Sequence, residues 1–129
     1  MKRVLIVEDE LLIADILEEV LVSDGFEVCG IARGVKEALT LAEQHNPELA
    51  IVDVHLIDGY GTDLAPVLLQ RYRTRIIYTT ANIDAVTNAI GHACLRKPFR
   101  LSLVKQAIDV SLQRSTDQLP IPVLLSDAC

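Results

Sequence analysis

Short apolar runs alternate along this chain with longer segments whose apolar residues recur at helical spacing. The apolar runs predict five strands, at residues 4–7, 27–32, 49–53, 75–79 and 93–96. The intervening segments predict helices up to about residue 23, at 35–45, at about 62–72, at 84–92 and after Pro98. Strands and helices in alternation predict an α/β fold: a parallel sheet with right-handed crossovers and helices on both faces.

The expected helices differ in quality. The first has Leu12, Ile16 and Val20 on one apolar face, and Gly25 is placed to end it with a left-handed cap. The fourth, at 84–92, includes Asn88 and Gly91 and has weak helical propensity. We therefore expect that helix to be short and poorly formed.

The apolar run 50–52 ends abruptly in Asp53, and a turn with Asp58 and Gly59 follows. Such a run is typical of a strand buried on both faces, and open α/β sheets bind their ligands at the carboxyl ends of the strands. The other strand ends also carry reactive side chains: Glu8, Asp9, Thr80 and Lys97. If the sheet is doubly wound, these groups converge on one crevice around Asp53.

Composition narrows the class of protein. The chain has 129 residues, which predicts one domain, and half of them are hydrophobic without any tryptophan, which predicts an aliphatic core. A formal net charge of −6 argues against direct binding of nucleic acid. The acidity fits a cation site and equally an ordinary solvated surface.

The ends and the cysteines indicate a cytoplasmic protein. Cys29, Cys94 and Cys129 lack metal-ligand spacing and are expected to be reduced thiols. The apolar run after Lys2 and Arg3 is too short for a signal peptide, and no stretch is long enough to span a membrane. We expect no membrane partner.

Four motifs at strand ends resemble those of the receiver domain of two-component response regulators. They are Val-Glu-Asp-Glu at 7–10, the isolated Asp53, Thr80-Ala81, and Lys97-Pro98-Phe99. Each motif is weak alone, but the four in this order are specific, and the resemblance covers about residues 2–114. It implies a flavodoxin-like, doubly wound five-stranded sheet of order 2-1-3-4-5.

The resemblance also implies roles for the residues. Asp53 would be the phosphoacceptor, taking a phosphoryl group from a phosphohistidine. One Mg²⁺ would be held by Glu8, Asp9, Asp53 and the backbone carbonyl of His55. Thr80 and Lys97 would contact phosphoryl oxygens. The Lys97–Pro98 bond resembles one that is cis in the family.

The implied partners are a sensor histidine kinase or a histidine phosphotransfer protein. In the family, the face formed by the fourth helix, fifth strand and fifth helix is the usual surface for a downstream protein target or a homodimer. Here that region departs from the family pattern. Cys94 stands where the family usually has Tyr or Phe, and the segment from Thr80 to Lys97 is shorter than usual. Cys94 is expected to be a small buried hydrophobe.

Each candidate also has a plainer interpretation. The acids at 8–10 could simply favour a helix N-terminus, Asp58 could cap the turn after Asp53, and Lys97 could be a solvated charge. The alternative function is an unphosphorylated, constitutive protein-interaction module with a receiver fold. A Mg²⁺ phosphohydrolase is a third hypothesis, but no Asp-x-Asp motif follows an apolar strand.

The chain is expected to divide into a receiver domain, residues 1–114, and an apolar tail or linker, 115–129. Pro120 and Pro122 interrupt the apolar residues of this tail. It could pack on the domain, pair with a partner or begin a linker. If the chain is complete, we expect a stand-alone receiver that acts by phosphoryl relay or by protein binding.

Overall fold

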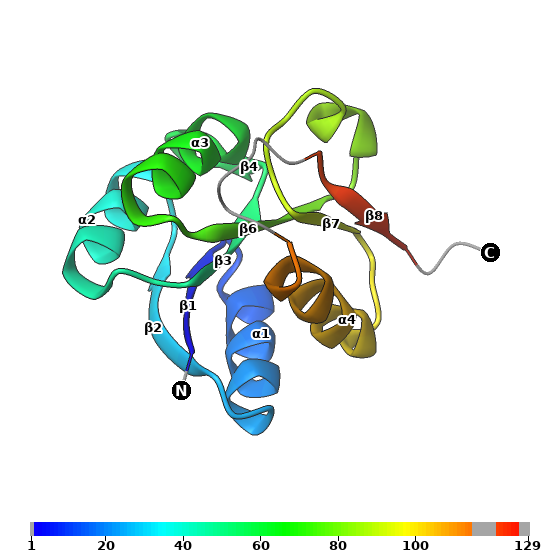
Figure 1. Ribbon diagram of the computed structural model, residues 1–129, viewed down its shortest axis with the longest axis horizontal. Helices are drawn as coiled ribbons and strands as arrows, with labels where there is room; N and C mark the ends of the chain where they lie inside the picture. The colour runs from blue at the N-terminus through cyan, green and yellow to red at the C-terminus, as the bar shows by residue number, and fades with distance from the viewer. Residues whose placement is uncertain (1, 115–120, 127–129) are drawn as a thin grey trace.

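The computed structural model describes residues 2–114 and 121–126 and shows a parallel sheet between two layers of helices (Figure 1). The sheet has the order β2-β1-β3-β6-β7-β8. Its strands are β1 (Arg3–Val7), β2 (Glu27–Ala32), β3 (Leu49–Asp53), β6 (Arg75–Thr80), β7 (Ala93–Arg96) and β8 (Val123–Leu125). The expected five-stranded, flavodoxin-like sheet is confirmed, and β8 extends it by one further parallel strand.

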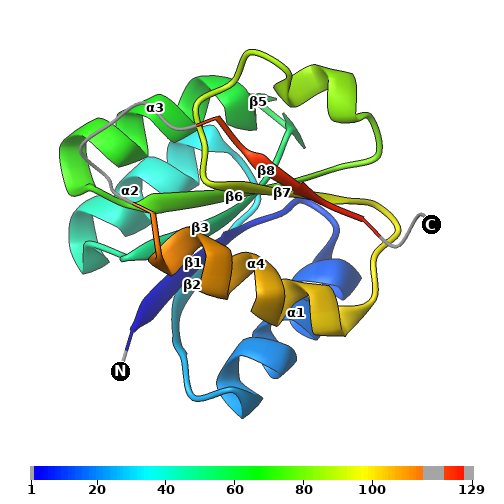
Figure 2. The ribbon, with the colours of Figure 1, turned by 45° about the vertical axis from the view of Figure 1, so that its right-hand side comes forward.

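Helices cover both faces of the sheet, as predicted (Figure 2). One face packs against α1 (Leu11–Ser23) and α4 (Leu101–Leu112), and the other against α2 (Val35–His45) and α3 (Gly61–Tyr72). β3 is buried along its whole length, and β1 from Val4 to Val7. Their continuous apolar runs follow from this burial on both faces.

The buried face of α1 differs from the one expected. Ala14, Leu17 and Leu21 face the core, whereas Leu12 is 75% exposed and Ile16 is 40% exposed. The apolar residues of α1 spread well beyond one narrow face, on both sides of Asp15, Glu18 and Glu19, so its sequence does not single out the buried side. Gly25 has φ of 89°, as the left-handed cap requires.

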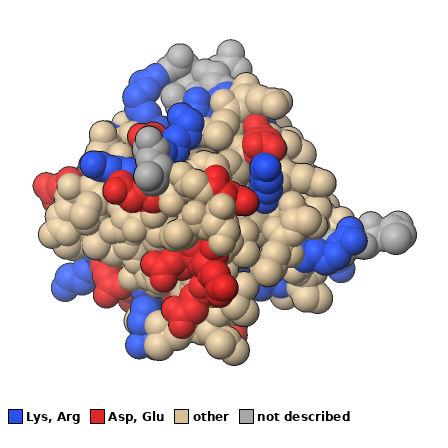
Figure 3. All heavy atoms as spheres, turned by 90° about the horizontal axis from the view of Figure 1, so that it is seen from below, with Lys and Arg blue, Asp and Glu red and all other residues tan. Residues whose placement is uncertain are grey.

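Seen from below, the molecule has a cluster of acidic side chains beside a broad area of uncharged surface (Figure 3).

The helix expected at 84–92 is wrong, because that segment forms only the 3₁₀ turn η1 (Ile83–Val86). The side chain of Asn82 accepts a hydrogen bond from the Asp84 backbone N–H and starts this turn. The sequence predicted that this region is short. The structure shortens it further, because a single turn stands where a helix was expected.

Two further strand pairs were not predicted. β4 (His55–Leu56) and β5 (Gly59–Tyr60) form a small antiparallel hairpin directly after β3. β8 lies in the expected tail, so the described part of the tail, 121–126, packs on the domain. The boundary at residue 114 stays a prediction, and 115–120 and 127–129 lie outside the described residues. Within the described parts of the chain, no helix has the length and apolar character of a membrane span.

Candidate functional site at the carboxyl edge of the sheet

Asp53 ends β3 between two strands that hold it firmly. β3 pairs with β1 on one side and β6 on the other, and the Val54 N–H donates to the Thr79 carbonyl. The Asp53 carboxylate accepts from the His55 N–H at 3.3 Å through Oδ1, and its Oδ2 lies 3.2 Å from Lys97 Nζ. Asp53 is only 7% exposed, so its charge faces fixed partners rather than bulk water.

Glu8 and Asp9 follow β1 and lie beside Asp53. One carboxylate oxygen from each of the three residues can be chosen so that all three lie within 4.8 Å of one another. Glu8 is 1% exposed, and its Oε2 accepts from the Glu10 N–H at 3.2 Å. Three hard oxygen donors around one point form the kind of ligand set that Mg²⁺ takes. The acids at 8–10 therefore do more than precede a helix.

Lys97 reaches the site from the end of β7. Its backbone N–H donates to the Thr80 carbonyl at 2.8 Å, and the following bond to Pro98 is cis, as the resemblance implied. Its Nζ lies 3.1 Å from Glu8 Oε1 and 3.2 Å from Asp53 Oδ2. Burial alone would lower the pKa of Lys97, but these two carboxylates outweigh burial and raise it. Lys97 is not a solvated charge.

The negative charge of the site exceeds its positive charge. Burial, and then the neighbouring Asp53, raise the pKa of Glu8 to about 7, while the Glu10 backbone hydrogen bond and Lys97 oppose the rise. One lysine therefore does not compensate the crowded carboxylates. This excess of charge on hard donors fits a divalent cation.

Thr80 lies at the neighbouring strand end, but its hydroxyl is engaged elsewhere. Its Oγ1 donates to the Asn82 carbonyl and accepts from the Asn82 N–H, both at 3.1 Å. The residue is 2% exposed. In this structure Thr80 thus forms a local turn, and a contact with a phosphoryl oxygen would require this turn to open.

His55 touches the site through its backbone. Its N–H bonds to Asp53, while its exposed ring lies edge-on to Tyr60 with centroids 5.6 Å apart. The use of its carbonyl as a cation ligand stays a prediction. Glu8, Asp9, Asp53 and Lys97 are thus the predicted site residues whose side chains the fold brings together.

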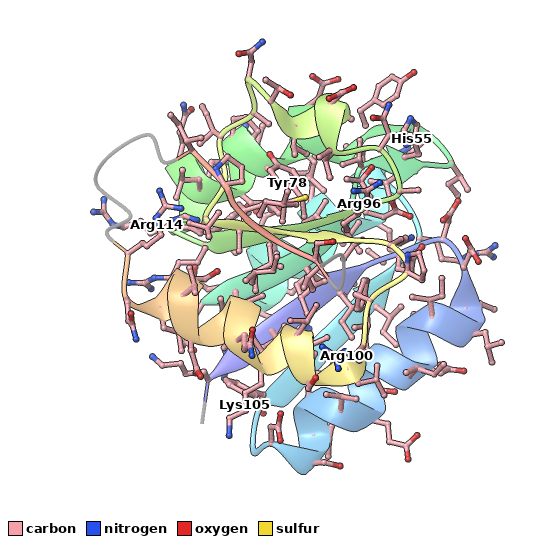
Figure 4. The ribbon with its side chains drawn as sticks, turned by 90° about the vertical axis from the view of Figure 1, so that its right-hand side faces the viewer. His55, Tyr78, Arg96, Arg100, Lys105 and Arg114 are labelled. Carbon is pink, nitrogen blue, oxygen red and sulfur yellow. The ribbon has the colours of Figure 1, made fainter. Side chains whose placement is uncertain are left out.

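The sequence interpretation missed Tyr78, which lies beside Cys94 on the neighbouring strand. Tyr78 and Cys94 are register partners on β6 and β7, and both are buried against the α3 face. The Tyr78 hydroxyl donates to the Ile90 carbonyl at 2.6 Å (Figure 4). A Cβ at Gly91 would lie 2.5 Å from the Tyr78 ring, so a glycine is needed there. An aromatic residue within a buried strand, followed by a glycine before the next strand, was the available signal.

Cys94 itself is a buried small hydrophobe, as expected. It is 1% exposed, and burial raises the pKa of its thiol to about 11. At neutral pH the thiol is protonated and a poor nucleophile.

Asp58 has a different role from the one expected. It caps the N-terminus of α2 rather than its own turn, accepting from the Val35 N–H at 2.6 Å and the Lys36 N–H at 3.2 Å. These hydrogen bonds lower the pKa of Asp58. The cap joins residues far apart in sequence, so local spacing could not reveal it.

Comparison with known proteins agrees with this geometry. Residues 4–109 match the family model of the response regulator receiver domain. The transcriptional regulatory protein PdtaR of Mycobacterium tuberculosis is 36% identical over 118 residues, covering 88% of this chain and 58% of that protein. The DNA-binding response regulator MtrA of Mycobacterium leprae is 29% identical over 122 residues, covering 91% and 54%. The chain belongs to the receiver domain family of response regulators.

Solved structures show the same fold. The response regulator PhyR from Brucella abortus superposes with a TM-score of 0.79 and 35% identity, covering 86% of this chain and 47% of that one. The receiver domain of PhyR from Erythrobacter litoralis gives a TM-score of 0.82 at 28% identity, covering 88% and 92%. The chain spans little more than half the length of the curated relatives above.

Proposed function

We propose that this receiver takes a phosphoryl group onto Asp53 from a phosphohistidine, in a Mg²⁺-dependent two-component phosphorelay. The donor would be a sensor histidine kinase or a histidine phosphotransfer protein. The phosphorylated domain would signal by a change of conformation or by binding a protein. It would be a phosphoacceptor signalling protein of the cytoplasm, without direct contact with nucleic acid or membrane, and not an enzyme apart from its own phosphotransfer and dephosphorylation.

The transfer makes one bond and breaks one. An Asp53 carboxylate oxygen attacks phosphorus, the P–N bond to the donor imidazole breaks, and the imidazole leaves with the electron pair and takes up a proton. When bound, Mg²⁺ supplies positive charge against the phosphoryl oxygens. Lys97 supplies a second positive charge from the end of β7, and the His55 N–H holds the acceptor carboxylate in place.

The observation that supports this proposal best is the ion-paired Asp53–Lys97–Glu8 group with Asp9 beside it. Lys97 Nζ contacts both carboxylates at 3.1 and 3.2 Å, while Glu8, Asp9 and Asp53 offer oxygens within 4.8 Å of one another. Asp53 would serve as the acceptor, the three carboxylates as cation ligands and Lys97 as a counter-charge. Electrostatic positioning of this kind is what phosphoryl transfer needs.

A groove next to this group could receive the donor. A groove of about 440 Å³ runs between α1 and the start of α4, lined by Ile13, Ile16, Leu101, Phe99 and, at its end towards the site, Lys97. The exposed Leu12 is on the same helix. We infer that the apolar face of a donor helix packs here and brings its histidine to Asp53.

The test is the intact mass of the protein after incubation with acetyl phosphate and Mg²⁺. We expect the wild type to gain one phosphoryl group, and Asp53→Asn or removal of Mg²⁺ to abolish the gain. Asp58→Asn is the matched control, because this carboxylate lies after the same strand but caps α2. A wild type that gains nothing from acetyl phosphate, and nothing from phosphorylated histidine-containing proteins, would overturn the proposal.

A second candidate is a constitutive interaction module that uses the fold without phosphorylation. Three observations favour it: the Thr80 hydroxyl is bonded to Asn82, Cys94 replaces the switch aromatic, and η1 replaces a helix. The ion-paired carboxylates count against it, because their burial has no evident use in simple packing.

A further inference from the structure

The edge of β7 is covered by the segment Ile121–Ser126, of which three residues form β8. The register partners are Ala93 with Val123, Cys94 with Leu124 and Leu95 with Leu125. The Val123 N–H donates to the His92 carbonyl at 3.2 Å, and Arg114 holds the start of the segment by donating to the Ile121 carbonyl at 2.7 Å. In Figure 4 β8 lies across the front of β7, with Arg114 at the end of α4.

The crossover connection from β7 to this strand has the uncommon handedness. The steps from β2 to β3, β3 to β6 and β6 to β7 run in one direction across the sheet with α2, α3 and η1 on one face. The step from β7 to β8 continues in that direction, but α4 lies on the opposite face. It is therefore a left-handed crossover, whereas about 98% of such connections are right-handed. The described contacts that hold β8 at this position are its pairing with β7 and the Arg114 hydrogen bond to Ile121.

The segment also meets the domain beside η1. A cavity of about 200 Å³ remains between η1 and β8, lined on the domain by Ile83, Asp84, Val86, Thr87 and Cys94 and on the segment by Ile121, Pro122 and Leu124. Leu124 of the segment and Cys94 of β7 therefore border the same space. Gly91 lies beside the segment as well, since a Cβ there would be in ordinary contact with Pro122 at 3.4 Å.

The segment only partly fills the site. Ile121 is 74% exposed, Val123 41% and Leu124 46%. Pro122 has no N–H to donate, which disfavours the pairing of a further strand with the outer edge of the segment. The features of the segment therefore suit a reversible cover more than a permanent core strand.

We propose that the edge of β7 and the cavity under η1 form a binding site for an extended apolar peptide, which the segment 121–126 occupies and masks. The partner class is a strand that pairs parallel with β7 and places one apolar side chain beside the cavity, as Leu124 does. The site does not depend on the proposed function. Its use as the output site does, because β7 runs directly into Lys97, and phosphorylation and release of the segment would be linked through that residue.

The first experiment tests the occupant by a disulfide. Leu124→Cys places a thiol in register with the native Cys94, in a chain that also carries Cys29→Ser and Cys129→Ser. Oxidation should give an intramolecular disulfide at the mass of the monomer. Val123→Cys is the matched control, because its side chain shares with Leu125 the α4 face, and it should not react with Cys94. A cross-linked dimer, or equal reaction of both variants, would contradict the claim that the chain's own segment lies on β7.

The second experiment tests the binding site with a fluorescent peptide of residues 119–127, LPIPVLLSD. Val123→Pro removes the N–H that bonds to His92 and should free the site. Because a tethered segment competes at an effective concentration of about millimolar, the peptide should bind this variant at least about tenfold more tightly than wild type. The oxidised Leu124→Cys chain should not bind it, and its reduced form is the control.

Equal affinity for the oxidised and reduced chains, or no binding to Val123→Pro and reduced Leu124→Cys alike, would overturn the proposal. Circular dichroism checks that each variant is folded. Neither experiment requires phosphate or Mg²⁺. The peptide site can therefore be tested even if the protein fails to take up a phosphoryl group.

Discussion

The carboxyl edge around Asp53 and the lateral edge at β7 follow different rules. At the carboxyl edge, Glu8, Asp53 and Lys97 form ion pairs near 3.1 Å that match the family motif residue by residue. At the lateral edge, η1 is a single turn, Cys94 is small and buried, and β8 covers the strand. The first region is fixed by chemistry, since its charges must meet at one point. The second is fixed only by packing, which other side chains can satisfy.

If Asp53 takes up a phosphoryl group as proposed, this contrast predicts that receiving it and presenting a surface are separable properties of the domain. Tyr78 illustrates how packing determines the lateral edge. It is buried beside Cys94 on the neighbouring strand, and its hydroxyl is bonded to the Ile90 carbonyl. The response to phosphorylation would then pass through β7 and its edge rather than through a rotating ring.

The largest expected effect belongs to the carboxyl edge. Lys97→Gln removes the cation that contacts Asp53 and Glu8, and we expect phosphorylation by acetyl phosphate to slow by about a hundredfold. Mg²⁺ affinity, measured by calorimetry, should not fall, because a positive charge has been removed. Lys105→Gln on α4 is the matched control and should react as the wild type. An unchanged rate in Lys97→Gln would contradict the view that chemistry determines the residues of this region.

The lateral edge should respond through stability instead. Tyr78→Ala leaves a large cavity and should lower the free energy of unfolding by about 3–5 kcal/mol. Tyr78→Phe removes only the hydrogen bond to Ile90 and should cost about 1 kcal/mol. Urea denaturation measures both, and Tyr60→Ala, at a side chain 53% exposed, is the control. Tyr78→Phe should keep the wild-type phosphorylation rate, and its loss would show that the two regions are not separable.

The smallest effect concerns the cap that Asp58 forms on α2. Asp58 has its pKa lowered by the Val35 and Lys36 N–H groups, so its stabilising contribution is present above the ordinary value of 3.8 and is lost as pH falls through the lower folded value. Asp58→Asn should therefore be less stable than wild type at neutral pH, and the difference should shrink in acid. Urea midpoints at several pH values measure this. A difference independent of pH would rule out the ionised cap as its cause.

Much of the fold followed from periodicity. The five long strands, four of the helices and the buried Asp53 strand were predictable, because burial on both faces leaves a continuous apolar run. The core face of α1 was not predictable, because its own apolar residues spread well beyond one narrow face. The helix at 84–92 was predicted wrongly, because weak helical propensity does not distinguish a short helix from a single turn.

The sequence by itself determined which chemical groups stand at the ends of the strands, since motif and strand end are both local properties. Only the tertiary structure decided that Lys97 bridges Asp53 and Glu8, that the Thr80 hydroxyl bonds to Asn82, and that Asp58 caps a distant helix. It alone placed β8 on β7. Each of these depends on contacts between segments far apart in the chain, and spacing along the sequence carries no information about which distant partner fills a space or accepts a hydrogen bond.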